Sequence, residues 1–165
     1  MTASKESTGV LPNTHQIKSE WLQITPGERF KIRTSVEETA GAYTMLELLV
    51  DSRNGVPMHI HRNEDEHFIV LDGTLHVAIG DKTLDAVAGT AVTVSKGIPH
   101  AWCNLSDTPL RILVVLSPGH IEGLFRAVAV RQSDDELPPL AERYGIEIIG
   151  PALHEGIYSI TSPRP

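Results

Sequence analysis

The stretch HIHRNEDEH, residues 59–67, places three of the chain's eight histidines beside three carboxylates. His59 and His61 are two positions apart, and residues at i and i+2 of a β-strand point to the same face. The pair is therefore suited to bind one ion with two imidazoles. Glu66 follows after RNED, which can turn the chain so that Glu66 opens a new strand beside the two histidines. The alternative is a solvated polar turn, and the rest of the chain has to decide between the two.

A further candidate ligand is His100, in the segment GIPHAWCN of residues 97–104. Gly97 and Pro99 make a tight entry to a short strand, on which His100, Trp102 and Asn104 would share one face. Three imidazoles and one carboxylate form a mixed nitrogen and oxygen set. Such a set suits Fe, Mn, Ni, Co, Cu or Zn and not an all-oxygen calcium or magnesium cage. It also leaves coordination positions for water or substrate, which is typical of a catalytic site.

Short segments rich in Val, Ile, Leu, Thr and aromatic residues make up the chain between residues 20 and 116, separated by Gly, Pro, Asn and Asp. This composition and spacing are typical of strands. Many short strands in succession predict an all-β sandwich or barrel and not a parallel α/β sheet. We expect strands at 20–24, 29–35, 43–50, 57–61, 66–71, 73–79, 82–86, 90–94, 99–103 and 110–116.

A length of 165 residues suits one domain with a sizeable core. Residues 1–18 are polar and aperiodic and are expected to form a flexible N-terminal arm, followed by a β-barrel over 19–118. Residues 119–165 are expected to form a helical extension. Apolar residues recur at helical spacing in 119–132, and 134–145 begins with acidic residues and ends on Gly145. These helices either cover one face of the sheet or form a lid over a pocket.

Charge and cysteine content exclude several classes of protein. The net charge of −7 argues against binding to nucleic acid or to an anionic membrane, because both need a cationic face. Cys103 is the only cysteine, so no intrachain disulfide is possible. The first residues lack the apolar core of a secretory signal, and no run is long and apolar enough to cross a bilayer. We therefore expect a cytoplasmic protein.

Two motifs in order resemble those of the cupin superfamily. HIHRNEDEHFIVLDG fits HxH-x4-E-x6-G from His59 to Gly73, and GTAVTVSKGIPHAWCN fits G-x7-G-x2-H-x3-N from Gly89 to Asn104. The resemblance is closest over residues 40–116 and implies a single antiparallel jelly-roll barrel. By the same resemblance, the barrel holds one divalent transition metal on His59, His61, Glu66 and His100. Two departures, a glycine at 55 that is four and not six positions before the first histidine and Ser95 in place of a proline, affect loops and spare the ligands.

The function that the resemblance implies is a metal-dependent enzyme, since the C-terminal segment resembles that of small single-domain bacterial cupins compared with quercetin dioxygenases. We expect a dioxygenase acting on an enol, phenolic or diketone small molecule, with Glu66 as the candidate catalytic base. Two alternatives stay open: an isomerase, cyclase or lyase similar to polyketide cyclases, and a non-catalytic metal- or ligand-binding cupin. The resemblance also implies a homodimer, in which the strands of residues 20–35 could pair along an edge.

Candidate pocket residues are Met45, Glu47, Phe68, Trp102 and Phe125. The four apolar residues either line a pocket or fill the barrel, and Glu47 points either to the site or to water at the edge of the sheet. Strand alternation predicts that His67 points outward, opposite to Glu66. His76 is expected on the outer face and Cys103 away from His100. Glu64 and Asp65 are expected to be solvated turn residues.

Overall fold

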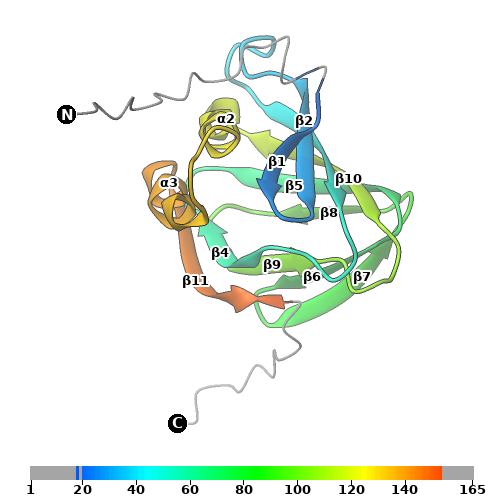
Figure 1. The fold of residues 1–165 in the computed structure, drawn as a ribbon. Coiled ribbons are helices and arrows are strands. Elements are labelled where there is room, and N and C mark those ends of the chain that lie inside the picture. The colour runs from blue at the N-terminus through cyan, green and yellow to red at the C-terminus, as the bar shows by residue number, and fades with distance from the viewer. Residues whose placement is uncertain (1–17, 19, 154–165) are drawn as a thin grey trace, which may run out of the picture.

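Eleven β-strands form the framework of the computed structural model, which describes residue 18 and residues 20–153 (Figure 1). Every strand pairing is antiparallel. In chain order the strands are β1 (Leu22–Thr25), β2 (Glu28–Thr34), β3 (Thr44–Val50), β4 (Pro57–His61), β5 (Asp65–Asp72), β6 (Thr74–Ile79), β7 (Lys82–Val87), β8 (Ala91–Val94), β9 (His100–Cys103), β10 (Leu110–Ser117) and β11 (Ile146–Ala152).

The strands form two sheets, one of six strands in the order β1-β2-β3-β10-β5-β8 and one of five in the order β11-β4-β9-β6-β7. The all-β prediction is confirmed, and each of the ten expected strands begins and ends within two residues of its predicted bounds. β11 was not predicted, because residues 146–152 fall in the segment that was expected to be helical. This strand pairs with β4, where Ile146 lies opposite His61 and Ile148 opposite His59.

The core lies between the two sheets and follows from strict alternation along the strands. In β10 the buried Leu110, Ile112, Val114 and Leu116 alternate with more exposed residues. The same alternation in the other strands directs one row of side chains inward, and together these form one continuous cluster: Phe30, Ile32, Leu46, Leu48, Val50, Phe68, Val70, Leu75, Val77, Val94 and Trp102. Burying this much apolar surface is the main source of stability for such a fold.

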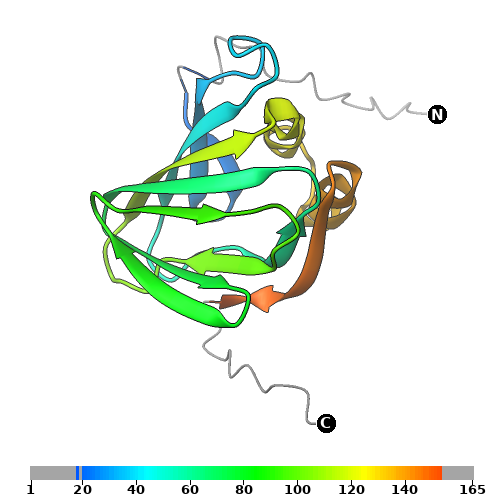
Figure 2. The same ribbon diagram turned by 180° about the vertical axis from the view of Figure 1, so that it is seen from behind.

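Two short helices follow the barrel strands and lie side by side at one edge of the two sheets, as Figure 1 and, from behind, Figure 2 show. They are α2 (Glu122–Val128), preceded by the 3-10 turn η1 (Gly119–Ile121), and α3 (Leu137–Arg143), preceded by η2 (Asp134–Glu136). Leu124 and Val128 join the core cluster, so the helices cover the barrel interior. With seven residues each, neither could cross a membrane, and the described part of the chain contains no helix that could.

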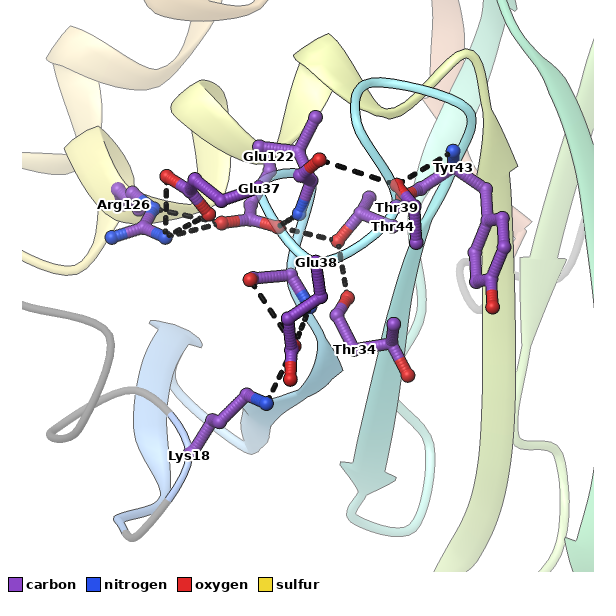
Figure 3. A network of polar contacts seen from close by, with 11 residues as sticks. Lys18, Thr34, Glu37, Glu38, Thr39, Tyr43, Thr44, Glu122 and Arg126 are labelled. Atoms are coloured by element: carbon purple, nitrogen blue, oxygen red, sulfur yellow. Dashed lines mark hydrogen bonds and ion pairs between the residues drawn. The ribbon is translucent and has the colours of Figure 1, made fainter.

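A buried carboxylate fixes α2 to the barrel (Figure 3). Glu122 is fully buried, and its carboxylate accepts hydrogen bonds from the Val36 amide at 2.8 Å and the Thr44 hydroxyl at 2.7 Å. Arg126, one turn further along α2, donates from Nε to the other carboxylate oxygen at 2.9 Å. Since both oxygens are satisfied, this charge can stay buried. The contacts tie the helix to β3 and to the loop that precedes it.

Candidate metal centre

Four buried side chains converge between the two sheets: His59, His61, Glu66 and His100. One ligand atom from each lies within 4.8 Å of the others. The five-stranded sheet supplies the histidines, with His59 directly opposite His100 in the β4–β9 pair. Glu66 comes from β5 of the other sheet and faces the histidines across the interior. The sequence predicted the convergence of these residues but placed Glu66 beside the histidines, whereas residues 62–64 carry the chain from one sheet to the other.

The geometry around the histidines directs their Nε2 atoms to a common centre. His59 Nε2 lies 3.2 Å from His61 Nε2, and His100 Nε2 lies 2.8 Å from a carboxylate oxygen of Glu66. On the far side of the rings, Nδ1 of His59 lies 2.7 Å from the carbonyl oxygen of Pro57. Nδ1 of His100 lies 3.0 Å from the carbonyl oxygen of Ile98.

A backbone carbonyl can only accept, so Nδ1 of His59 and of His100 must carry the proton, and each neutral ring then offers the lone pair of Nε2 to the centre. Buried nitrogen lone pairs that face one another beside a carboxylate are satisfied by a cation. These residues therefore fit a divalent transition metal.

Electrostatics favours this state for His59 and Glu66, whereas Glu66 favours the protonated form of His100, which must lose that proton to bind a metal. Burial and the neighbouring His100 lower the pKa of His59 to about 3, so this ring is neutral and able to donate its lone pair. Burial by itself would raise the pKa of Glu66, but electrostatic interaction with the imidazoles of His61, His100 and His59 and the His100 hydrogen bond lower it to about 2. Burial lowers the pKa of His100, and Glu66 more than offsets this and raises it. The carboxylate is thus ionised in the resting site, as a metal ligand must be.

Glu64 corrects one expectation of the sequence analysis. It is not a solvated turn residue but is buried with 3% of its surface exposed, and one carboxylate oxygen lies 3.6 Å from Nδ1 of His61. Asp65 is half-buried and accepts a hydrogen bond from the Lys96 amide at 2.9 Å. Glu64 thus stands behind His61, beyond hydrogen-bond distance but near enough for its charge to act on that imidazole. The sequence NED at residues 63–65 does not by itself indicate that Glu64 is buried and its neighbours are not.

His67, His76 and Cys103 lie where strand alternation predicts them. His67 points away from the centre and its Nδ1 lies 3.0 Å from the Thr93 hydroxyl. His76 pairs with Asp85 at 2.6 Å between β6 and β7. Cys103 belongs to a small apolar cluster on the outer side of the five-stranded sheet, separate from the main core.

A mainly apolar cavity of about 150 Å³ borders His59, His61 and Glu66. Both sheets and both helices contribute to its wall, with β11 adding Ile146 and Ile148. The helical segment is therefore both a cover for the barrel and a wall of the cavity. The apolar lining residues are Ile24, Leu46, Leu48, Val56, Trp102, Val114, Leu124, Phe125, Leu137, Ala141, Ile146 and Ile148.

Two of the five predicted pocket residues, Trp102 and Phe125, line this cavity. Met45 and Glu47 do not, because they alternate with the inward-facing Leu46 and Leu48 of β3 and so point to the outer face. Phe68 faces inward but is packed in the core beside Trp102, with ring centroids 6.1 Å apart, and does not line the cavity.

The sequence analysis missed a further polar residue of the cavity wall, Glu28. Only 1% of its surface is exposed. One carboxyl oxygen accepts a hydrogen bond from the Thr25 hydroxyl at 2.6 Å, and the other has no hydrogen-bond partner in the described part of the chain. The signal was present, since Glu28 alternates with the apolar Phe30 and Ile32 in ERFKI, which predicts that all three face inward.

Comparison with known sequences identifies the barrel. Residues 46–116 match the sequence model of the cupin domain. The chain carries a cupin domain. Gly55, the glycine that departs from the usual cupin spacing, lies against β9, and a Cβ atom there would come within 2.3 Å of the Trp102 carbonyl oxygen.

Two curated relatives share low identity with this chain. One is quercetin 2,3-dioxygenase of Bacillus subtilis, 22% identical over 139 residues, or 78% of this chain and 41% of the relative. The other is mannose-1-phosphate guanylyltransferase 2 of Escherichia coli O157:H7, 28% identical over 98 residues, or 59% of this chain and 18% of the relative. The chain thus spans less than half the length of either relative.

Solved structures confirm the jelly-roll fold. KdgF from Halomonas superimposes with a TM-score of 0.57 at 17% identity, covering 63% of this chain and 90% of that chain. A predicted oxalate decarboxylase from Thermotoga maritima gives 0.55 at 20% identity, covering 64% and 96%. The polyketide cyclase RemF from Streptomyces resistomycificus gives 0.50 at 22% identity, covering 55% and 65%. At these identities the likeness establishes the fold alone.

Proposed function

We propose that this cupin is a metal-dependent dioxygenase that acts on a small enol, phenol or β-diketone bound at His59, His61, Glu66 and His100. The observation that carries the proposal is the joint arrangement of these four buried groups and the apolar cavity that borders them. The ligand set fits a divalent transition metal and leaves coordination positions open. The similarity to quercetin 2,3-dioxygenase supports the choice of oxygenase chemistry.

The cavity limits the substrate. Its volume of about 150 Å³ lies below the range of about 300–1,000 Å³ that is common for drug-sized ligands. Aromatic and aliphatic walls from Trp102, Phe125 and Leu124 suit a compact, mostly apolar molecule. When bound, the metal would favour the anion of an enol or phenol and so make the substrate reactive towards O2. The chain's own part is to hold that anion in a water-poor space and to keep Glu66 ionised.

A second candidate, an isomerase, cyclase or lyase of the same substrate class, is favoured by the carboxyl group of Glu28 in the cavity wall. Chemistry on an enolisable carbon needs a proton carrier and no O2. The structural likeness to the polyketide cyclase RemF is compatible with this alternative. A cupin that only binds a ligand would use neither O2 nor a proton carrier.

The first experiment is elemental analysis of the anaerobically purified protein beside its His100→Ala variant, with His76→Ala as a matched control. We expect about one metal ion per chain in the wild type and in His76→Ala, and less than a tenth of it in His100→Ala. His76 is a suitable control because it lies on the outer side, paired with Asp85. Full metal content in His100→Ala, or none in the reconstituted wild type, would overturn the metal site.

The second experiment separates the reaction classes. The loaded protein is supplied with acetylacetone or catechol, and O2 uptake is followed with an oxygen electrode. A dioxygenase consumes O2 in proportion to substrate and loses activity when Zn replaces the redox-active metal. An isomerase or lyase converts its substrate equally well without O2. Saturable binding without any turnover points to a binding protein.

We also propose a homodimer. β1 lies at one edge of the six-stranded sheet, so its outer side is available for pairing with a second copy. Light scattering that gives the mass of one chain would remove this proposal.

A further inference from the structure

Glu28 is a buried carboxyl group that has no charged partner among residues 18 and 20–153. It is the first residue of β2, and its side chain shares the inner face of the sheet with Phe30 and Ile32. The Thr25 hydroxyl donates to one oxygen at 2.6 Å, and within the described residues nothing hydrogen-bonds to the other. A buried polar atom left unsatisfied costs about 1–3 kcal/mol, so a role in binding or catalysis would account for its presence.

The charged groups on neighbouring elements are engaged elsewhere. Glu47 on β3 points to the outer face and binds Arg111 and Arg33. Arg29, the residue after Glu28, is directed outward and lies 3.9 Å from Asp51. On α2, Glu122 and Arg126 bind each other.

With no cation beside Glu28, burial raises its pKa above the ordinary value of 4.5 and the Thr25 hydrogen bond only partly opposes this. The neutral acid is thus favoured, and its proton can sit on the oxygen without a partner.

Glu28 and the metal centre border the same cavity. Among the described residues that line it, the titratable groups are Glu28, His59, His61 and Glu66. Oε2 of Glu66 lies 2.8 Å from Nε2 of His100 and 3.5 Å from Nε2 of His61, so this carboxylate belongs to the four-residue site. Among the described residues of this wall, Glu28 is the one carboxyl group that lies outside the four-residue site.

We propose that Glu28 is the acid–base residue of the cavity and that it exchanges a proton with the enolisable carbon of the substrate. The proposal rests on the proposed function, because the oxygens of the substrate are held at the four-residue site. In one direction the O–H bond of Glu28 breaks and its proton joins the central carbon of the enolate. The electron pair of the carbon–carbon double bond forms the new C–H bond, the enolate oxygen becomes a carbonyl, and Glu28 is left as a carboxylate. The reverse step breaks that C–H bond and restores the acid, so neither oxidant nor reductant is needed.

The test uses acetylacetone, the smallest β-diketone, as the probe with metal-loaded protein in D2O. Proton NMR follows the replacement of hydrogen by deuterium at the central carbon. The Glu28→Gln variant keeps the size of the side chain and an oxygen that can accept from Thr25, but cannot carry the proton. We expect the catalysed exchange rate to fall at least about 100-fold, which is typical of the loss of a general acid–base group. The metal content and the affinity for acetylacetone, measured by calorimetry, should change less than about threefold.

Glu47→Gln is the matched control, because it removes another buried carboxyl group of the same sheet from the face that does not border the cavity. Its exchange rate should equal that of the wild type. Binding of the probe without catalysed exchange in the wild type, or equal exchange in Glu28→Gln, would overturn the role of Glu28 and leave the metal site intact. Failure of the loaded wild type to bind acetylacetone would refute the proposed function, and the role of Glu28 with it.

A second readout does not depend on activity. The infrared difference spectrum between the wild type and Glu28→Gln at neutral pH should contain the carbonyl stretch of a buried protonated carboxyl group. Addition of saturating acetylacetone should shift this band, because the acid then contacts the probe. Absence of the band would show that Glu28 is ionised and would contradict the proposal even if exchange is slow in the variant.

Discussion

The two faces of the six-stranded sheet each contain a buried carboxyl group, and the two groups differ in their partners. Glu28 on β2 and Glu47 on β3 lie on adjacent strands, with 1% and 2% of their surfaces exposed. Glu47 lies on the outer face, where Arg111 donates to one oxygen at 2.5 Å and Arg33 donates to the other. Glu28 lies on the inner face with one hydroxyl partner.

The titration of the two groups follows from this difference. Burial alone would raise both pKa values. In Glu47 the two arginines overcome burial and lower the pKa, whereas in Glu28 no cation does so and the pKa is raised. Since both groups are buried, the difference in their charge comes from their partners. The outer face holds a permanent anion that stabilises the fold, and the inner face holds an acid that is available for chemistry.

The largest expected effect extends the comparison to a third buried carboxylate, Glu122. Its partner Arg126 is more buried than the partners of Glu47, with 14% of its side chain exposed. Glu122→Ala should therefore lower the free energy of unfolding by about 3–5 kcal/mol, as expected when a buried ion pair loses one member. Chemical denaturation measures this. Glu37→Ala, which removes the exposed partner of Arg126, should cost less than about 1 kcal/mol. A loss below 1 kcal/mol for Glu122→Ala would mean that an arginine partner does not distinguish a carboxylate that stabilises the fold from one that is available for proton transfer.

Removal of the outer-face carboxylate, Glu47, should lower the free energy of unfolding by a smaller amount. Glu47→Ala is expected to cost about 2 kcal/mol, because the two arginines it leaves are half-exposed and can be rehydrated. The pKa of Glu47 is lowered, so its contribution is present above pH 4.5 and disappears as the pH falls through the lowered pKa. Denaturation at pH 7 and pH 3 measures both effects. A cost that grows on acidification would contradict this assignment, as would a loss of bound metal.

The contrast also shows how far the sequence predicts the site. The HxH spacing and strand alternation identified His59 and His61, and the second motif identified His100, because such patterns are local. The residues that contact the carboxyl group on each face come from segments that are distant in the sequence. Glu47 was expected as a pocket candidate because its outward direction depends on the register of β3, in which it alternates with buried leucines. Its arginines come from β2 and β10, which no spacing in the sequence brings together.

Elements that depend on tertiary contacts were missed for the same reason. β11 begins three residues after the last residue of α3, and its strand conformation comes from pairing with β4. Glu64 was hidden among neighbouring acidic residues and is singled out only by burial behind His61. Glu28 could have been found, since its alternation with Phe30 and Ile32 is as clear as that of the histidines. An acidic residue in register with buried apolar ones deserves the same scrutiny as a histidine pair.

A smaller effect is expected on the metal affinity when the carboxylate of Glu64, which acts through His61, is removed. Glu64→Gln should lower the metal affinity about 10-fold, or about 1.4 kcal/mol, because the amide orients and polarises His61 less well than a carboxylate. Titration with a competing chelator measures the affinity. Glu147→Gln is the control, since Glu147 of β11 forms an exposed pair with Arg62, the residue that follows β4, and should leave the affinity unchanged. An unchanged affinity in Glu64→Gln would assign Glu64 to packing alone.

The smallest expected effect is the change in the free energy of unfolding that Glu28→Gln causes at low pH. It is also the most direct test of the comparison between Glu28 and Glu47. At pH 4.5 the variant and the wild type should differ by less than about 1 kcal/mol, since a neutral amide replaces a mostly neutral acid. The raised pKa means that the acid favours the folded state below pH 4.5 and that this advantage is lost as the pH rises through the folded pKa. The variant should therefore become progressively more stable than the wild type on going from pH 4.5 to pH 8, by at most about 1.4 kcal/mol per pH unit for one group.

Denaturation of both metal-loaded proteins across this range measures that slope, which runs opposite to the slope of Glu47. Cations near a carboxylate reverse the sign, so a wild type that gains stability over Glu28→Gln with rising pH would reveal a positive partner for Glu28. A constant difference would mean that the carboxyl group titrates alike in the folded and unfolded chains. Only the predicted slope leaves the inner face with a carboxyl group that stays protonated because no cation faces it, and that is the property a proton carrier at this position requires.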